Sequence, residues 1–316
     1  QSNVKQMSYS VSYWSDFIND WPNIPAQPLS ILNTTYFGNG TGNLYTRSSW
    51  NTNAIFVHTI AGVYDQSHAH KDQGSFMLNS AGAWLFDDAN RRSNSGIDQE
   101  EEYHNLVRFS AGGSTVRQVE GAAPSQVVAL SDGTYFTYEL MNTKPIYNNK
   151  AEVVKSEREM VFIKSGAVVL FDRAAANSAN VSRIFQLQMS GAPTINGNQL
   201  SFTNSNQRAD VWRVAPATVS WTTVPVFSGV RAEGVDSNGT QSLFLHVVGV
   251  NNKVSSVVAD STATETGARI TFADGTIATV RFSNTGRGGT MLLVNNGQTL
   301  FNGPLPITVN TFPLYQ

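Results

Sequence analysis

Histidines are concentrated in one part of this sequence. Four of the five lie between His58 and His104. Within that stretch His68, His70 and Asp72 are spaced two residues apart, and side chains at that spacing share one face of an extended chain. Two imidazoles and a carboxylate on one face could bind a metal ion or transfer protons.

Further candidate metal ligands follow downstream. Asp87 and Asp88 are adjacent, and His104 comes after them. Neutral imidazoles with one carboxylate form a nitrogen and oxygen ligand set that suits Zn²⁺ or a similar divalent ion. A His-x-His pair alone is weak evidence, because histidines hydrogen-bonded within a strand give the same pattern. The downstream acids and the third histidine favour a metal site.

A cupin-like metal enzyme is an alternative reading of the same histidines. The spacing of two glycines around the His-x-His pair matches the start of a cupin metal motif. That motif requires a glutamate three or four residues after the second histidine, where this sequence has Gly74 and Ser75. Neither residue can bind a metal as a carboxylate does, so the cupin alternative is disfavoured.

Strand and turn signals dominate the sequence from Asn43 onward. Short apolar runs flank turn dipeptides such as Asp132-Gly133, Asn196-Gly197 and Asp274-Gly275, which is typical of β-hairpins. We therefore predict an all-β fold, an antiparallel β-sandwich of two sheets, over residues 43–316. A sub-boundary near residue 210 is an option within it.

The first 42 residues have a different pattern. Apolar residues recur there at helix-like offsets, and prolines then interrupt the run; the apolar residues are Trp14, Phe17, Ile18 and Trp21. We predict that residues 1–42 are a partly helical linker or docking segment. The chain begins at Gln1 without a methionine, so we expect a processed or truncated form.

Composition excludes several classes of function. Lys and Arg total 21 against 23 Asp and Glu, and this near-neutral balance argues against general nucleic-acid binding. The sequence contains no cysteine, which excludes disulfides and thiolate metal sites. It also contains no apolar run long enough for a membrane span. We expect a secreted or periplasmic bacterial protein.

Several stretches, taken in order, resemble the heparinase II/III-like polysaccharide lyase family, in the C-terminal β-sandwich of its members. The stretches are Leu44–Trp50, His68–Phe76, Gly82–Asp88, Glu102–Asn105, Glu157–Phe162 and Val169–Arg173. Each alone is unspecific, but their order is specific. Nothing in the sequence resembles the helical toroid that precedes this sandwich in the family.

The resemblance implies roles for the histidines and acids. His68 would be the histidine on the catalytic side, while His70, Asp87 and His104 would hold a structural Zn²⁺ or another divalent ion. We prefer Asp87 over Asp88 as the acidic ligand, because this choice keeps the preceding apolar strand aligned with the family pattern.

Other polar residues would support the site. Asp72 would orient a histidine by accepting its ring N–H. Four cations could bind a sugar carboxylate or sulfate, although each also fits a plain surface charge; they are Arg47, Lys71, Arg91 and Arg92.

The reaction implied by the resemblance is β-elimination at a uronic acid in a polysaccharide. Such a reaction needs a base beside the sugar carbon and a group that neutralises the sugar carboxylate. In the family these groups lie largely in the helical toroid, so an upstream helical domain or a separate chain would supply them. Tyr64 is the local candidate for a tyrosine base, and a packed strand residue is the alternative for it.

The substrate would be alginate, a glycosaminoglycan or a similar polymer, and the near-neutral charge favours an unsulfated uronan such as alginate. A non-catalytic carbohydrate-binding or scaffold module with a structural zinc is the second hypothesis.

Overall fold

The computed structural model describes most of the chain, namely residues 27–66, 68–89, 99–226 and 229–308. It divides the chain into two compact units, residues 1–33 and 34–316. The helical pattern from Trp14 to Trp21 lies outside the described residues. The described end of the first unit contains one 3-10 helix, η1 (Leu29–Ile31).

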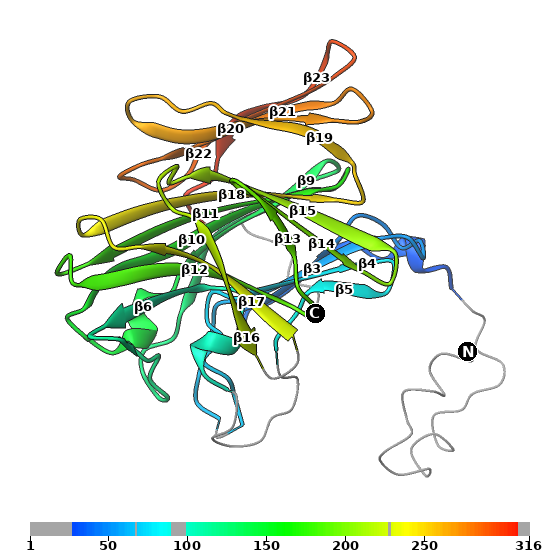
Figure 1. The fold of residues 1–316 in the computed structure, drawn as a ribbon. Helices are drawn as coiled ribbons and strands as arrows, with labels where there is room; N and C mark the ends of the chain where they lie inside the picture. Colours follow the sequence, from blue (N-terminus) through cyan, green and yellow to red (C-terminus); the bar gives the residue numbers. More distant parts are fainter. Residues whose placement is uncertain (1–26, 67, 90–98, 227–228, 309–316) are drawn as a thin grey trace, which may run out of the picture. The chain divides into compact units, whose positions relative to one another are not determined.

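The second unit is built from four sheets (Figure 1). The first sheet has the order β1-β2-β3-β4-β5 and consists of β1 (Thr35–Gly38), β2 (Asn43–Arg47), β3 (Ile55–Ile60), β4 (Phe76–Ser80) and β5 (Ala83–Phe86). The eight-stranded sheet has the order β13-β14-β15-β18-β11-β10-β9-β8 and consists of β8 (Gln126–Asp132), β9 (Phe136–Asn142), β10 (Val153–Ile163), β11 (Ala167–Ala176), β13 (Thr194–Asn196), β14 (Gln199–Asn204), β15 (Gln207–Ala215) and β18 (Gln241–Val250).

Two further five-stranded sheets complete the unit. The third sheet has the order β16-β17-β12-β6-β7 and consists of β6 (Val107–Ala111), β7 (Ser114–Thr115), β12 (Val181–Met189), β16 (Trp221–Val226) and β17 (Gly229–Asp236). The fourth is a meander of β19 (Val254–Ala259), β20 (Glu265–Phe272), β21 (Ile277–Ser283), β22 (Gly289–Asn295) and β23 (Gln298–Leu305). Two 3-10 helices, η2 (Glu101–Tyr103) and η3 (Lys144–Tyr147), lie in connections between strands.

Every strand pair in the described residues is antiparallel. The predicted all-β antiparallel sandwich is confirmed, with its strands divided among four sheets where we expected two. Residue 210, the optional sub-boundary, lies inside β15, and β1 begins ahead of residue 43. None of the helices in the described residues has the length and apolar character needed to cross a membrane.

The turn dipeptides act as the sequence predicts. Asn196-Gly197 connects β13 to β14, and Asp274-Gly275 connects β20 to β21. Gly197 and Gly275 have φ angles of 59° and 85°, in the left-handed region that glycine adopts without a steric penalty. These local choices set the register of the two hairpins.

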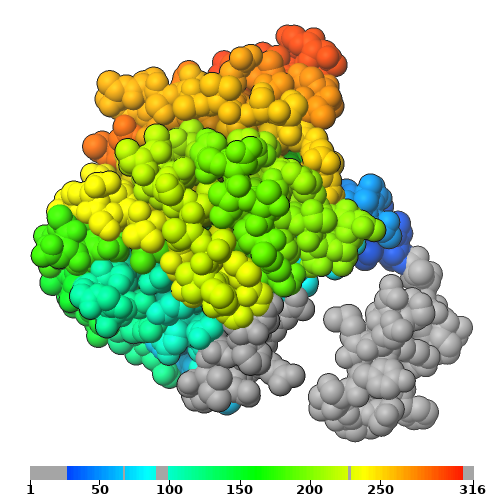
Figure 2. Space-filling view, viewed as in Figure 1, coloured from blue at the N-terminus to red at the C-terminus, as the bar shows by residue number. Residues whose placement is uncertain are grey.

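The eight-stranded sheet is covered on both faces. In β10, Met160 and Phe162 belong to one hydrophobic core, which includes residues of the first and third sheets. Val161 and Ile163 belong to a second core, which includes residues of the fourth sheet. Figures 1 and 2 show β19–β23, orange to red, stacked directly on this sheet. Because both faces are buried, the end of β10 from Met160 to Ile163 is a continuous apolar run instead of an alternating one, whereas the polar residues Ser156–Glu159 before it are also buried.

A carboxyl group is buried between the first and the eight-stranded sheets. Glu139 in β9 is 0 % exposed, and its Oε2 accepts a hydrogen bond of 2.5 Å from the Thr59 hydroxyl in β3. Burial raises the pKa of Glu139 from 4.5 to about 8, and the Thr59 hydrogen bond offsets part of this rise. The folded chain therefore keeps this proton at a pH where the unfolded chain has lost it.

The free energy of unfolding should consequently fall between about pH 5 and pH 9, and Glu139→Gln should remove part of that fall. The pKa is higher in the folded state, so the stabilisation is complete below the unfolded pKa and is lost as pH rises through the folded pKa. At 1.4 kcal/mol per pKa unit, the fall due to Glu139 is roughly 3–5 kcal/mol. Urea unfolding across this pH range measures it. The exposed Glu120→Gln serves as the control, and equal pH slopes in the wild type and Glu139→Gln would contradict the assignment.

Candidate metal centre

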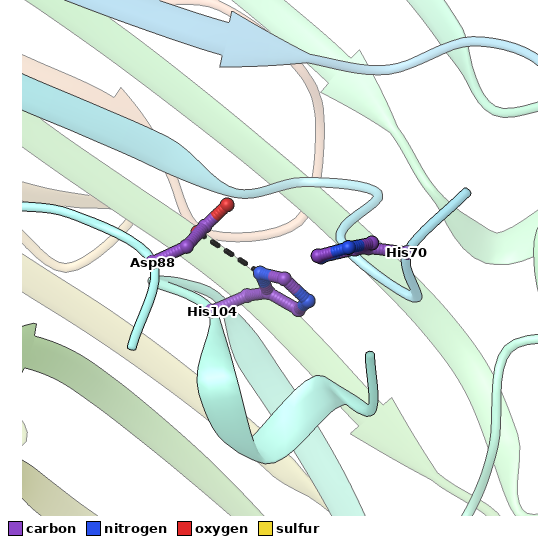
Figure 3. A group of neighbouring side chains, drawn as sticks. All are labelled: His70, Asp88 and His104. Carbon is purple, nitrogen blue, oxygen red and sulfur yellow. Dashed lines mark ion pairs between the residues drawn. The ribbon is translucent and has the colours of Figure 1, made fainter. Parts of the chain in front are cut away.

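Three separate segments bring their ligand atoms together. His70 lies in the loop between β3 and β4, Asp88 follows the end of β5, and His104 follows η2. One ligand atom from each of the three side chains lies within 4.8 Å of the others, and Figure 3 shows the side chains converging. Two imidazoles and one carboxylate match a set of protein ligands for Zn²⁺, with room for a further ligand.

The geometry within this cluster fits a cation. His104 is 0 % exposed, and its Nδ1 lies 2.9 Å from Asp88 Oδ1. The His104 ring thus has two polar neighbours, the carboxylate of Asp88 and the backbone of Gln99. The His70 and His104 rings lie 5.1 Å apart, inclined by 51°. Two imidazoles and a carboxylate gathered in this largely buried position form a suitable ligand set for a shared metal ion.

Electrostatics point in the same direction. Burial, the largest single influence, lowers the pKa of His104. The charge and hydrogen bond of Asp88, the charge of Asp72 and the backbone of Gln99 together outweigh it and raise this pKa to about 9. The pKa of His70 is lowered, first by burial and then by the charge of His104. Burial also raises the pKa of Asp72 to about 6. Asp88 and Asp72 thus stabilise a positive charge at His104, and a bound metal ion would supply that charge in place of the proton.

Buried glutamines hold the segment that carries His104. In β12, Gln186 Nε2 donates to the carbonyls of Glu101 and His104, at 2.5 and 2.8 Å. Gln188 Nε2 donates to the Glu102 carbonyl at 2.8 Å. These bonds satisfy the carbonyls of Glu102 and His104, and they add a second donor to the Glu101 carbonyl, which accepts from the His104 backbone N–H within η2. The sequence analysis missed both glutamines; the signal was their alternation with apolar residues within one strand.

Asn105 ties the three ligand-bearing segments together. Its Nδ2 donates to the Asp87 carbonyl at 3.2 Å, and its backbone N–H donates to Ser75 Oγ at 3.0 Å. Its Oδ1 accepts from the backbone N–H of Gln188 at 2.6 Å. Asn105 is fully buried, so its backbone and side chain together fix the relative positions of the loops before β4 and after β5.

Arg158 fixes the same loops to the eight-stranded sheet. Its Nε and Nη2 donate to the two oxygens of Asp172, at 2.6 and 3.1 Å. Its Nη1 donates to the carbonyls of Gly74 and Asn105, at 2.8 and 2.7 Å. Arg158, which belongs to the family-like stretch Glu157–Phe162, thus acts as a buried support for the loops that carry the metal cluster.

The acidic member of the cluster differs from our preference. The cluster contains Asp88, whereas the Oδ1 of Asp87 accepts a hydrogen bond of 3.0 Å from the backbone N–H of Asp88. We preferred Asp87 by extending the apolar strand through it, but β5 ends at Phe86. Beyond that point side-chain alternation no longer decides which acid faces the histidines.

The His-x-His segment also differs from the extended chain we considered. The described residues around His68 and His70 form a loop with turns, and β4 begins only at Phe76. His70 reaches the cluster from this loop. Asp72 Oδ1 accepts a hydrogen bond of 3.1 Å from Gln73 Nε2, so its role in orienting a histidine stays a prediction.

His68 and Tyr64 are placed very differently. His68 is exposed, two residues from the cluster, and its carbonyl accepts a hydrogen bond from Gln99 Nε2. Tyr64 is 6 % exposed and belongs to the hydrophobic core, and burial raises its pKa. His68 can therefore meet a substrate, whereas the phenol of Tyr64 has the environment of a packing residue and does not suit the catalytic role considered for it.

Two of the four cations that we considered as sugar-binding groups, Arg47 and Lys71, have protein partners. The Arg47 guanidinium lies 4.2 Å from the centre of the Trp50 ring. Lys71 Nζ lies 2.9 Å from Glu100 Oε1. Arg91 and Arg92 lie outside the described residues, so their role stays a prediction.

Comparison with known proteins identifies solved structures that have a similar fold. No family model and no curated protein sequence matches the chain. A solved structure of the heparinase III BT4657 gene product matches with a TM-score of 0.66 at 13 % identity, over 89 % of this chain and 47 % of that one. The heparan sulfate lyase HepC from Pedobacter heparinus matches with a TM-score of 0.63 at 13 % identity, over 98 % of this chain and 48 % of that one.

At this level of identity the likeness shows the fold. The predicted resemblance to heparinase II/III-like lyases is confirmed in that sense, since the chain has the β-sandwich architecture of heparinase III structures. The chain spans less than half the length of the structures that it matches.

Proposed function

We propose that this chain is the metal-binding β-sandwich part of a polysaccharide lyase that cleaves a uronic-acid-containing polymer by β-elimination. The observation that carries the proposal is the cluster of His70, Asp88 and His104, next to the exposed His68, in a fold shared with heparinase III structures. The candidate substrates are alginate, heparan sulfate and other polyuronates.

The chemistry requires a proton to leave the carbon beside the uronate carboxylate. A positioned base and a donor that neutralises the carboxylate both lower that barrier. His68 is the exposed imidazole on this chain that could contact the sugar. The other groups would come from a helical domain or a separate chain, which agrees with the span of less than half of the matched structures.

Zn²⁺ is the ion that we propose for the cluster, in a structural role. When bound, it would be held by His70, Asp88 and His104, and it would supply the positive charge that fixes these segments. The chain's own residues then hold His68 at the surface. A secreted or periplasmic location is also part of the proposal, because a sugar polymer of this kind is degraded outside the cytoplasm.

The test is the release of unsaturated uronate by the longest natural form of the protein that contains this chain. We expect ultraviolet absorbance to rise with at least one of alginate, heparan sulfate and hyaluronan. His68→Ala should lower kcat by at least about 100-fold, the effect of losing a group that moves or stabilises charge at the reacting carbon. The neighbouring exposed Gln66→Ala should leave kcat unchanged. Absence of product with every polyuronate would contradict the proposal.

A second candidate is a non-catalytic carbohydrate-binding or scaffold module with a structural zinc. The burial of Tyr64 favours it for the isolated chain, because the local tyrosine cannot serve as the base. Binding of a glycan without product, in the presence of the upstream region, would support this candidate. Iron or manganese in the cluster in place of zinc would support the cupin-like alternative.

A further inference from the structure

A hollow of about 510 Å³ lies beside η3 and the start of β10. Its wall includes Lys144 in η3, Lys155 in β10 and Arg287 in the β21–β22 connection. The residues of the metal cluster do not line it. The volume falls within the range of small-molecule sites, roughly 300–1,000 Å³.

Positive charge exceeds negative charge among the described residues that line this hollow. The wall contains three cations, Lys144, Lys155 and Arg287. It contains one carboxylate, that of Glu157. Glu157 is only 7 % exposed, and a further cation, Arg173 Nη1, lies 4.0 Å from its Oε2. The single negative charge is therefore already compensated, which leaves a positive potential in the hollow.

Two of the three cations, Arg287 and Lys155, are held in place by protein partners. Arg287 Nε donates to Glu157 Oε1 at 2.8 Å, and Arg287 Nη2 lies 2.8 Å from the same oxygen, so the guanidinium is anchored while its Nη1 is available. Lys155 Nζ donates to the Thr285 carbonyl at 3.2 Å and lies 3.5 Å from Glu157 Oε2. Among the described residues, the Lys144 ammonium has no partner. Cations anchored in this way lose little freedom when an anion binds.

The rest of the wall suits a sugar ring. Asn148 and Asn149 expose their side-chain amides, which can donate to and accept from hydroxyl groups. Pro145 and Val154 provide apolar surface, and Val154 is 56 % exposed. The hollow thus combines three kinds of group. Its amides can bind hydroxyl groups, its apolar surface can contact the face of a sugar ring, and its ammonium groups can bind a carboxylate or sulfate. This combination matches an anionic saccharide.

We propose that this hollow is a second binding site, separate from the residues of the metal centre, for a sugar unit that bears a carboxylate or a sulfate. It would hold a polymer chain on the sandwich without taking part in its cleavage. The choice of a uronate as the principal probe rests on the proposed function, whereas the charge and geometry of the hollow do not.

Calorimetric titration of the intact chain with short saccharides tests the proposal. A saturated alginate trisaccharide and a heparan sulfate disaccharide are the anionic probes, and cellotriose is the neutral one. We expect saturable binding of at least one anionic probe and weaker or absent binding of cellotriose. Binding of alginate alone would identify a carboxylate site, and preference for the sulfated probe would identify a sulfate site.

The double variant Lys144→Gln/Lys155→Gln should weaken that binding by about tenfold or more, because it removes two charge-assisted contacts. The matched control is Lys253→Gln/Arg269→Gln, which removes two exposed cations elsewhere and should leave binding unchanged. Equal weakening in both variants, or no saturable binding of either anionic probe to the folded chain, would overturn the proposal. Lyase activity is measured separately with His68→Ala, so failure of the proposed function leaves this result interpretable.

Discussion

Replacing Arg158 by alanine is expected to lower the free energy of unfolding by about 3–5 kcal/mol, the range seen when one partner of a buried ion pair is removed. Arg158 is 2 % exposed and makes a two-pronged contact with Asp172. Its loss leaves a buried carboxylate without its counter-charge and removes the donor of two buried carbonyls. Urea unfolding at neutral pH, with a fixed zinc concentration, measures the change.

The control for this prediction is Arg269→Ala. Arg269 lies in β20 and is exposed, so its removal should change the free energy of unfolding by less than about 0.5 kcal/mol. If both variants lost the same small amount of stability, Arg158 would not be the support of the ligand-bearing loops that we describe.

Asp88→Asn is expected to weaken zinc binding by at least about 100-fold, since loss of groups that only support a metal ligand already costs 10- to 100-fold. The substitution removes the anionic ligand of the cluster. It also removes the charge that lies 2.9 Å from the buried Nδ1 of His104. Competition with a chromophoric chelator at constant pH measures the affinity of both proteins.

Asp87→Asn is the matched control because it neutralises the adjacent acid. The Oδ1 of Asp87 accepts a hydrogen bond from the backbone N–H of Asp88, and an amide oxygen can accept the same bond. We therefore expect zinc affinity to change by less than about tenfold, at the low end of the effect of losing a group that only supports a metal ligand. Loss of zinc in Asp87→Asn with retention in Asp88→Asn would show that the carboxylate ligand is Asp87 after all.

Local signals predicted the fold because its hairpins are set by local chemistry. Asn196-Gly197 and Asp274-Gly275 connect neighbouring strands, and each glycine takes the positive φ that the turn requires. Division into four sheets was not predictable in the same way. It depends on which faces of β10 and its neighbours are covered, and a continuous apolar run does not reveal what covers it.

The candidate site was predictable as a set of residues, and its geometry was not. Family-like spacing identified His70, His104 and the pair of acids. The choice between Asp87 and Asp88 depends on where β5 ends, and strand ends are poorly determined by sequence. Likewise, the His-x-His segment is a loop because the chain turns before β4, which the alternation of its residues does not show.

The supports of the site are non-local and could not be read from spacing. Arg158 reaches carbonyls of two loops that are far from it in the sequence, and Gln186 reaches the segment of His104 from another strand. The cationic hollow has the same character, because η3, β10 and the β21–β22 connection meet only in the folded chain. Such contacts follow from topology, so they become visible only once the sheet order is known.

Anomalous diffraction at the zinc absorption edge, from crystals of the chain grown with zinc, tests the central claim most directly. We predict one strong peak, at about 2.0–2.2 Å from a nitrogen of His70, a nitrogen of His104 and an oxygen of Asp88. The claim would be contradicted by a map that has no zinc peak at that position and shows the zinc bound elsewhere. Crystals in which the imidazoles of His70 and His104 lie apart would contradict it as well.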